Sequence, residues 1–110
     1  MLPTLALLAA LNQSAPTPLS LEHRMLLRCS AAFATVAQGQ ANGSAEALVY
    51  PDLRENGREF FVSASAQVMD EAGLDREQIA AALATEAQDL RGSETLEQIM
   101  PACLALLPAA

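Results

Sequence analysis

The feature that most constrains the fold is a pair of cysteines near opposite ends of an Ala- and Leu-rich chain. Each cysteine lies on an apolar stripe with helical spacing, formed by Met25, Cys29 and Ala32 and by Ile99, Cys103 and Leu107. Two thiols allow only one intramolecular pairing, and an apolar setting shelters a disulfide. We therefore predict a Cys29–Cys103 disulfide that joins the first and last helices.

Composition favours helices throughout. The chain has 110 residues, which is enough for one domain, and more than half of them are apolar although only 4% are aromatic. Its apolar residues are mainly Ala and Leu, which favour helix over strand. We predict an all-α single domain of four helices, or of five if a short turn at 45–49 is helical.

The first two long helices have recognisable ends. Ser20 is suited to cap a helix from Leu21 to about Gln38, with Gly39 as its stop. After the turn at 45–49 and Pro51, a second helix is expected over about 52–72, ended by Gly73. One face of it forms an apolar groove, with small residues at its centre and aromatic ones on its flanks, suited to a partner or to another helix: Leu53, Gly57, Phe60, Phe61, Ala64 and Val68.

The strongest local pattern begins the third helix. Asp75 and Gln78 can form a capping box, and Leu74 can pack on Ile79 as a hydrophobic staple. This helix is expected to run to Gly92. Ser93 would then cap a fourth helix, in which Pro101 requires a kink or a new start.

The amino terminus has the outline of a secretory signal. An apolar run at 5–11 is followed by a polar, proline-containing stretch, and the run is too short to span a bilayer. We expect a signal peptide at 1–15, a linker at 16–19 and a helical domain at 20–110. The expected location is the periplasm or outside the cell. A cytoplasmic protein, with free thiols, is the alternative.

Charge and motifs argue against several classes of partner. The formal net charge is −7 and the six basic residues, all Arg, form no basic run, so nucleic acids and anionic membranes are not expected partners. No metal-ligand spacing, phosphate loop or cofactor motif occurs in the sequence. The sequence therefore predicts no cofactor and no metal.

Few residues are candidates for catalysis. His23 is the only histidine, so an enzyme with a His base would have to use it. Arg54 and Arg58 lie four residues apart and could clamp an anion, although Glu55 could also pair with Arg58. No catalytic constellation is evident, and the chain does not read as an enzyme.

Two stretches carry a resemblance to a group of proteins. Residues 28–33 (Arg-Cys-Ser-Ala-Ala-Phe) and 57–62 (Gly-Arg-Glu-Phe-Phe-Val) together resemble the small, uncharacterised two-cysteine helical proteins exported by GC-rich Gram-negative bacteria. The resemblance covers most of the chain after Ser20. It implies no activity and no site residue.

Three functions remain open at this point. The first is a periplasmic helical module that binds a protein or a small apolar ligand, because the sequence offers an apolar groove but no reacting groups. The second is a periplasmic stress holdase, which would expose apolar surface in acid. The third is an enzyme that uses His23.

We predict that the mature protein begins between about Ala15 and Leu19, because the capped, periodic region starts at Ser20. The intact mass of protein purified from its native host checks this. Full-length protein recovered from the cytosol would contradict it and would weaken the argument for the disulfide.

Overall fold

A computed structural model describes residues 19–91 and 94–108, and that part of the chain contains helices only. The prediction of an all-α domain is confirmed, and the turn expected at 45–49 is present as a short fifth helix. The helices are α2 (Leu21–Ala41), α3 (Ala45–Leu48), α4 (Asn56–Ala72), α5 (Arg76–Asp89) and α6 (Glu94–Leu104).

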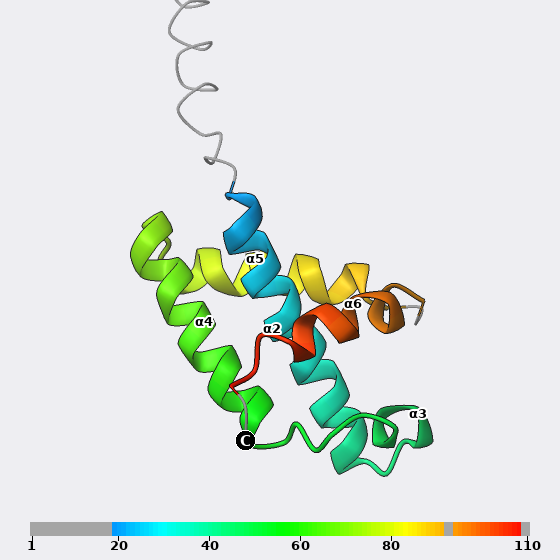
Figure 1. Ribbon diagram of the computed structural model, residues 1–110. Helices are drawn as coiled ribbons and strands as arrows, with labels where there is room; N and C mark the ends of the chain where they lie inside the picture. Colours follow the sequence, from blue (N-terminus) through cyan, green and yellow to red (C-terminus); the bar gives the residue numbers. More distant parts are fainter. Residues whose placement is uncertain (1–18, 92–93, 109–110) are drawn as a thin grey trace, which may run out of the picture.

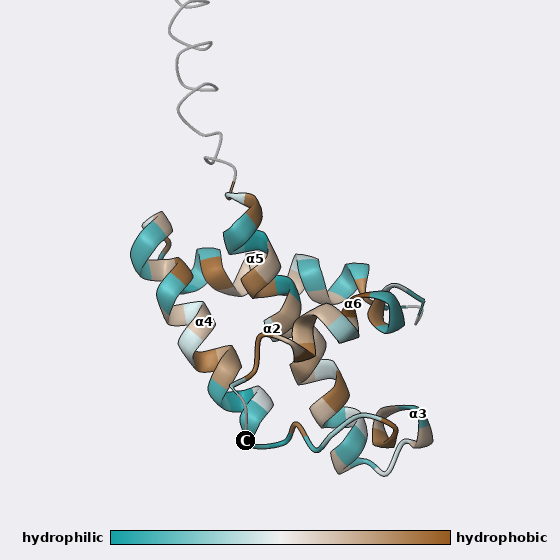
Figure 2. Ribbon diagram, viewed as in Figure 1, coloured by the Kyte–Doolittle hydropathy of each residue, from teal (hydrophilic) through white to brown (hydrophobic). Residues whose placement is uncertain are grey.

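Helix α2 is the centre of the domain. The other four described helices all pack on it, and α4 also contacts α5 (Figure 1). Hydrophilic residues are frequent on the outer helices, whereas the middle of α2 and much of α6 are hydrophobic (Figure 2). Since α2 is covered on several sides, its middle must carry apolar or small residues almost continuously, and residues 29–33 are all buried.

The core consists of two clusters along α2. One surrounds the disulfide and joins α2 to α6 and to the α3–α4 connection. Its buried members include Phe33, Leu53 and Met100. The other lies where α2 meets α4 and α5 and is centred on Leu27, Val68 and Ile79. The two clusters together fix α4 and α5 against α2.

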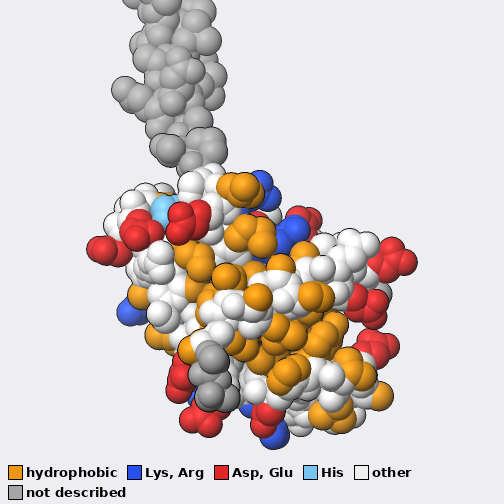
Figure 3. All heavy atoms as spheres, viewed as in Figure 1, with side chains coloured by type: hydrophobic (Ala, Val, Ile, Leu, Met, Phe, Trp, Pro, Cys, Tyr) orange, Lys and Arg blue, Asp and Glu red, His pale blue; other side chains and the backbone are white. Residues whose placement is uncertain are grey.

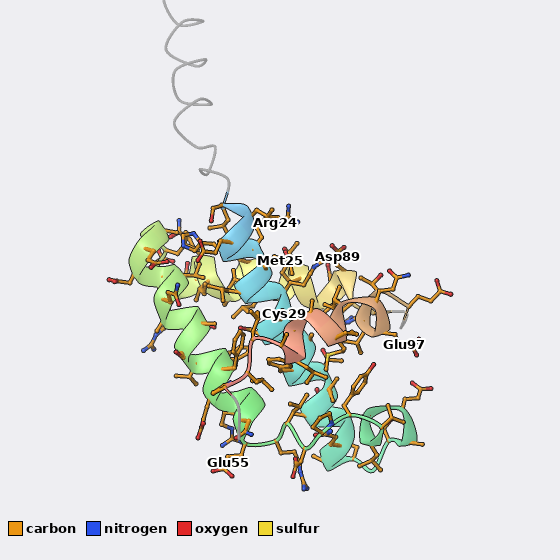
Figure 4. All side chains as sticks on the ribbon, viewed as in Figure 1. Arg24, Met25, Cys29, Glu55, Asp89 and Glu97 are labelled. Carbon is orange, nitrogen blue, oxygen red and sulfur yellow. A yellow bond between two sulfur atoms is a disulfide. The ribbon has the colours of Figure 1, made fainter. Side chains whose placement is uncertain are left out.

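The predicted disulfide between Cys29 and Cys103 is present and joins α2 to α6. Both residues are fully buried, and their Cα atoms lie 5.2 Å apart. Cys29 lies midway along α2, on the side that α6 crosses (Figure 4). The disulfide therefore holds the last helix on the central one.

Several helix ends match the sequence patterns. The Ser20 hydroxyl accepts a hydrogen bond from the backbone N–H of His23 at 3.1 Å. The capping box of α5 is complete: the Gln78 N–H donates to Asp75 Oδ1 at 2.8 Å, and the Asp75 N–H donates to Gln78 Oε1 at 2.9 Å. Gly73 ends α4 with a left-handed φ of 68°, as expected of a terminating glycine.

The predicted stop of the first helix at Gly39 was wrong. Helix α2 continues to Ala41, and the left-handed residue that follows it is Gly43, with φ 74°. Gly39 has a different role, because a Cβ atom there would lie 2.7 Å from the Cβ of Ala47. The glycine lets α3 pack directly on α2, a tertiary requirement that a local pattern does not reveal.

The predicted start of the second helix near residue 52 was also wrong, because α4 begins at Asn56. The buried Gln40 side chain accounts for the delay. Its Oε1 accepts from the backbone N–H of Leu53 at 2.9 Å, and its amide donates to the carbonyl of Pro51 at 2.8 Å. Asp52 adds a local turn by accepting from the N–H of Arg54 at 3.1 Å. The Gln40 hydrogen bonds and the Asp52 turn keep residues 51–54 outside α4.

Some of the other predicted segment ends lie outside the residues that the structure describes, and some lie within them. The predicted signal peptide, most of the linker and the Ser93 cap fall outside the described residues. The predicted end of the third helix at Gly92 was wrong, because α5 ends at Asp89 with Leu90 as its C-cap. Pro101 lies inside α6, which continues to Leu104 instead of starting anew. Because proline has no N–H, the Glu97 carbonyl receives no helical hydrogen bond from it.

Polar contacts add to the packing of α2. Arg28 on α2 donates to Glu86 Oε1 at 2.9 Å and to Asp89 Oδ2 at 2.8 Å, both on α5. Glu86 is buried, and the guanidinium supplies the partner that a buried carboxylate requires. His23 and Glu71 form a second contact, between α2 and α4, at 2.9 Å.

We predict that reduction, or Cys29→Ser, leaves a helical but loosely packed chain. The disulfide closes a loop with a sequence separation of 74 residues, for which the chain-entropy model gives a stabilisation of about 4 kcal/mol. Circular dichroism should therefore show retained helix in the far ultraviolet and a much lower melting temperature. Thiol counting on the unreduced protein is the control. Two free thiols, or a melt that reductant does not change, would contradict the prediction.

Candidate functional site

An open groove lies between α2 and the beginning of α4. Its volume is about 470 Å³, within the range of roughly 300–1,000 Å³ that is usual for small-molecule sites. Small apolar side chains dominate its surface, and three longer polar side chains also line it. The lining residues are Ala34, Ala37, Gln38, Ala41, Arg54, Gly57, Arg58 and Phe61.

Helical spacing explains this lining. Ala34, Ala37 and Ala41 follow one stripe along α2, at steps of three and four residues. The opposite wall repeats at similar steps, from Arg54 through Gly57 to Phe61. Because the α2 wall carries mainly alanine methyl groups, with Gln38 among them, and the other wall has a glycine at its middle, the two helices leave a hollow that larger side chains would fill.

Gly57 brings the two helices together at the groove. A Cβ atom at this position would lie 3.2 Å from the Cβ of Phe33 on α2 and 3.2 Å from the Cβ of Leu53. Both neighbours are buried and have little freedom to move. Gly57 is therefore required for the close approach of α4 to α2.

The residues of the expected groove on the second helix have different surroundings. Most of them face the interior: Leu53, Gly57, Ala64 and Val68 are buried, and Val68 packs in the cluster of Leu27. Phe60 makes an edge-to-face contact with Phe33, with ring centroids 5.1 Å apart. Only Gly57 and Phe61 of the six also line the open groove. Its other wall, on α2, was missed by sequence reasoning, although the Ala34, Ala37 and Ala41 repeat was visible.

The two arginines at the groove have different electrostatic surroundings. Arg54 donates from Nε and Nη2 to the two carboxylate oxygens of Asp52, both at 2.9 Å. These hydrogen bonds lower the pKa of Asp52 to about 2. Arg58 makes no ion pair with any residue that the structure describes, and the pairing with Glu55 suggested by their spacing is absent there.

His23 lies outside this groove. Its Nε2 is 2.9 Å from Glu71 Oε1, and Gln67 also donates to that oxygen, at 3.2 Å. The hydrogen bond from His23, followed by that from Gln67, lowers the pKa of Glu71. The pair links the beginning of α2 to the end of α4. Cys29 and Cys103 are fully buried in the disulfide and offer no thiol.

A second apolar area covers α6 and the segment that follows it (Figure 3). Leu104 and Leu107 are half-buried there, packed on the disulfide cluster, whereas Leu106 is 49% exposed. This area is mainly the solvent-facing surface of side chains that pack on the disulfide cluster. The groove between α2 and α4 differs from it by combining a hollow with polar and charged side chains, and it is therefore the better candidate site.

Comparisons with protein-family models, with curated proteins and with solved structures gave no match. None of the described helices has the length and hydropathy needed to cross a bilayer. Within residues 19–91 and 94–108, no group of three or more His, Cys, Asp or Glu side chains could hold a metal ion.

We predict that Gly57→Leu destabilises the protein by roughly 1–3 kcal/mol, since it overpacks the contact with Phe33. Gly57→Ala should change the free energy of unfolding much less, because a gain in helix propensity of about 1 kcal/mol opposes the steric cost. Ala66→Leu, at an exposed position on the same helix, is the matched control. Denaturant unfolding measures all three. A Gly57→Leu variant as stable as the parent protein would contradict the close approach.

Proposed function

We propose that this protein is exported to an oxidising compartment, the periplasm or the cell exterior, and binds a small apolar molecule there in the groove between α2 and α4. The observation that carries the proposal is the open groove of about 470 Å³ with an apolar floor. The disulfide and the signal-like amino terminus support the location.

The shape of the groove favours a small ligand over a protein partner. Its floor follows the methyl groups of one alanine stripe, and Phe61 supplies a half-buried aromatic wall. A hollow of about 470 Å³ can hold an alkyl chain or a flat ring, whereas a stable protein interface buries roughly 1,200–2,000 Å² of surface and would extend well beyond it. Burying such a ligand on methyl and aromatic groups yields roughly 25 cal/mol per Å² of apolar surface removed from water.

Binding, rather than catalysis, is the role that these side chains suit. Within the described part of the chain, the groove lining contains no acid, histidine or thiol. His23 is engaged with Glu71 away from the groove. Acid–base catalysis there would need a group that takes or gives a proton near neutral pH, and a guanidinium is not such a group.

A stress holdase is the second candidate, and the contacts between α2 and its neighbours favour it. The Arg28–Glu86 and His23–Glu71 contacts both depend on ionised carboxylates. Because the pKa of Glu71 is lowered in the folded protein, its contribution to stability is present above its ordinary pKa and is lost as the pH falls through the lowered value. A holdase of this kind requires that acid loosen the fold and expose buried apolar surface. A dye that binds apolar surface would detect this exposure.

The groove is tested with N-phenyl-1-naphthylamine, a neutral fluorescent dye, and with decanol as its competitor. We expect the protein to bind the dye, decanol to displace it, and Ala34→Phe to weaken binding by about tenfold or more, equivalent to roughly 1.4 kcal/mol, because the new ring fills the groove. Ala84→Phe, at an exposed position on α5, is the matched control and should bind normally.

Amide shifts in two-dimensional NMR should locate the bound decanol at residues 34–41 and 57–61. Absence of dye binding, or equal binding by the Ala34→Phe variant, would overturn the proposal. Binding that appears only in acid, together with loss of near-ultraviolet dichroism, would favour the holdase.

A further inference from the structure

The groove is lined by positively charged side chains, whereas the molecule as a whole is acidic. The chain has a formal net charge of −7, yet among the residues that the structure describes the only ionisable ones lining this groove are two arginines. Gln38, on the α2 wall, adds an exposed amide. Hydrogen-bond donors for an anion therefore line a hollow whose remaining surface is apolar.

Only one of the two guanidinium charges is free. Both carboxylate oxygens of Asp52 accept hydrogen bonds from Arg54, and these bonds lower the pKa of Asp52, so that its carboxylate is ionised at neutral pH. Arg54 is thus neutralised, while Arg58 lacks an ion-pair partner among the described residues. Glu55 and Glu59 are its acidic neighbours in sequence, but neither lines the groove, and Glu55 lies at the very beginning of α4 (Figure 4). Among the described lining residues, Arg58 therefore carries the one positive charge that has no ion-pair partner.

We infer that the occupant of the groove is an aliphatic monocarboxylate, with its alkyl chain along Ala34, Ala37 and Ala41 and its carboxylate on Arg58. This inference rests on the proposed function and adds the chemical class of the ligand. A guanidinium donates two parallel N–H bonds to one carboxylate, and the Gln38 amide offers a further donor from the opposite wall. A doubly charged phosphate head would exceed the single unpaired charge of Arg58, and the acidic protein would repel it more strongly than it repels a carboxylate.

The experiment compares three ligands with the same alkyl chain, decanoate, decanol and decyl phosphate, by dye displacement at neutral pH and below their micelle concentrations. We expect decanoate to bind about tenfold more tightly than decanol, as for a charge-assisted hydrogen-bonded pair. Added salt should weaken decanoate binding and leave decanol binding unchanged. Decyl phosphate should bind more weakly than decanoate.

Two variants test the charge assignment directly. Arg58→Gln should reduce decanoate binding to the level of decanol, whereas Arg76→Gln, at an exposed position on α5, should leave it unchanged. Asp52→Asn should tighten decanoate binding several-fold, because it frees the Arg54 guanidinium while keeping an oxygen for the turn. Decanol binding should be the same in all three variants. Unchanged melting temperatures show that each variant is folded.

Failure of the carboxylate inference and failure of the proposed function would give different experimental results. If decanol and decanoate bind equally, or if Arg58→Gln keeps the preference for decanoate, the inference is overturned and the groove remains a neutral apolar site. Tighter binding of decyl phosphate overturns the choice of carboxylate. If no ligand binds the parent protein, the proposed function itself fails.

Discussion

The burial of α2 on several sides is the constraint on which the rest of the structure depends. All the other described helices pack on it, so its middle must be apolar or small without interruption. The few polar side chains buried along it have assigned partners. Ser30 donates to the Leu26 carbonyl at 2.8 Å, and Gln40 binds the α3–α4 connection. A buried polar group without a partner would cost about 1–3 kcal/mol, so these contacts permit the burial and also fix what packs there.

Small residues on α2 and α4 explain why the domain has a closely packed contact and a hollow side by side. Gly57 lets α4 approach Phe33 so closely that a Cβ atom would be crowded. One step away, the alanines on α2 are too short to reach the opposite wall, and the groove remains open. Closing the hollow would require α4 to move, but the packing of Leu53 and Phe60 on Phe33 and its surroundings prevents this.

The sequence predicts correctly those features whose determining contacts are local or, as for two cysteines, have only one possible partner. The capping box of Asp75 and Gln78 spans three residues, and the disulfide had only one possible pairing. Prediction from the sequence failed where a contact with a residue distant in the sequence determines where a helix begins or ends. Gly39 serves the packing of Ala47, and the start of α4 is delayed by Gln40, thirteen residues before Leu53. The same reason applies to the candidate site: the sequence indicated one wall, on α4, but the second wall lies on α2, and pairing the two requires the tertiary structure.

The disulfide and the groove are connected through Phe33. This side chain is fully buried in the cluster that contains both cysteines, and its Cβ side meets Gly57 at the groove. The disulfide holds α6 over that cluster, so Phe33 and the α4 backbone beside it are fixed before any ligand arrives. A preformed groove loses little conformational entropy on binding, which matters for a small ligand with little surface to bury. If the groove binds a ligand as proposed, breaking the disulfide should weaken that binding through a looser Phe33, although neither cysteine lines the groove.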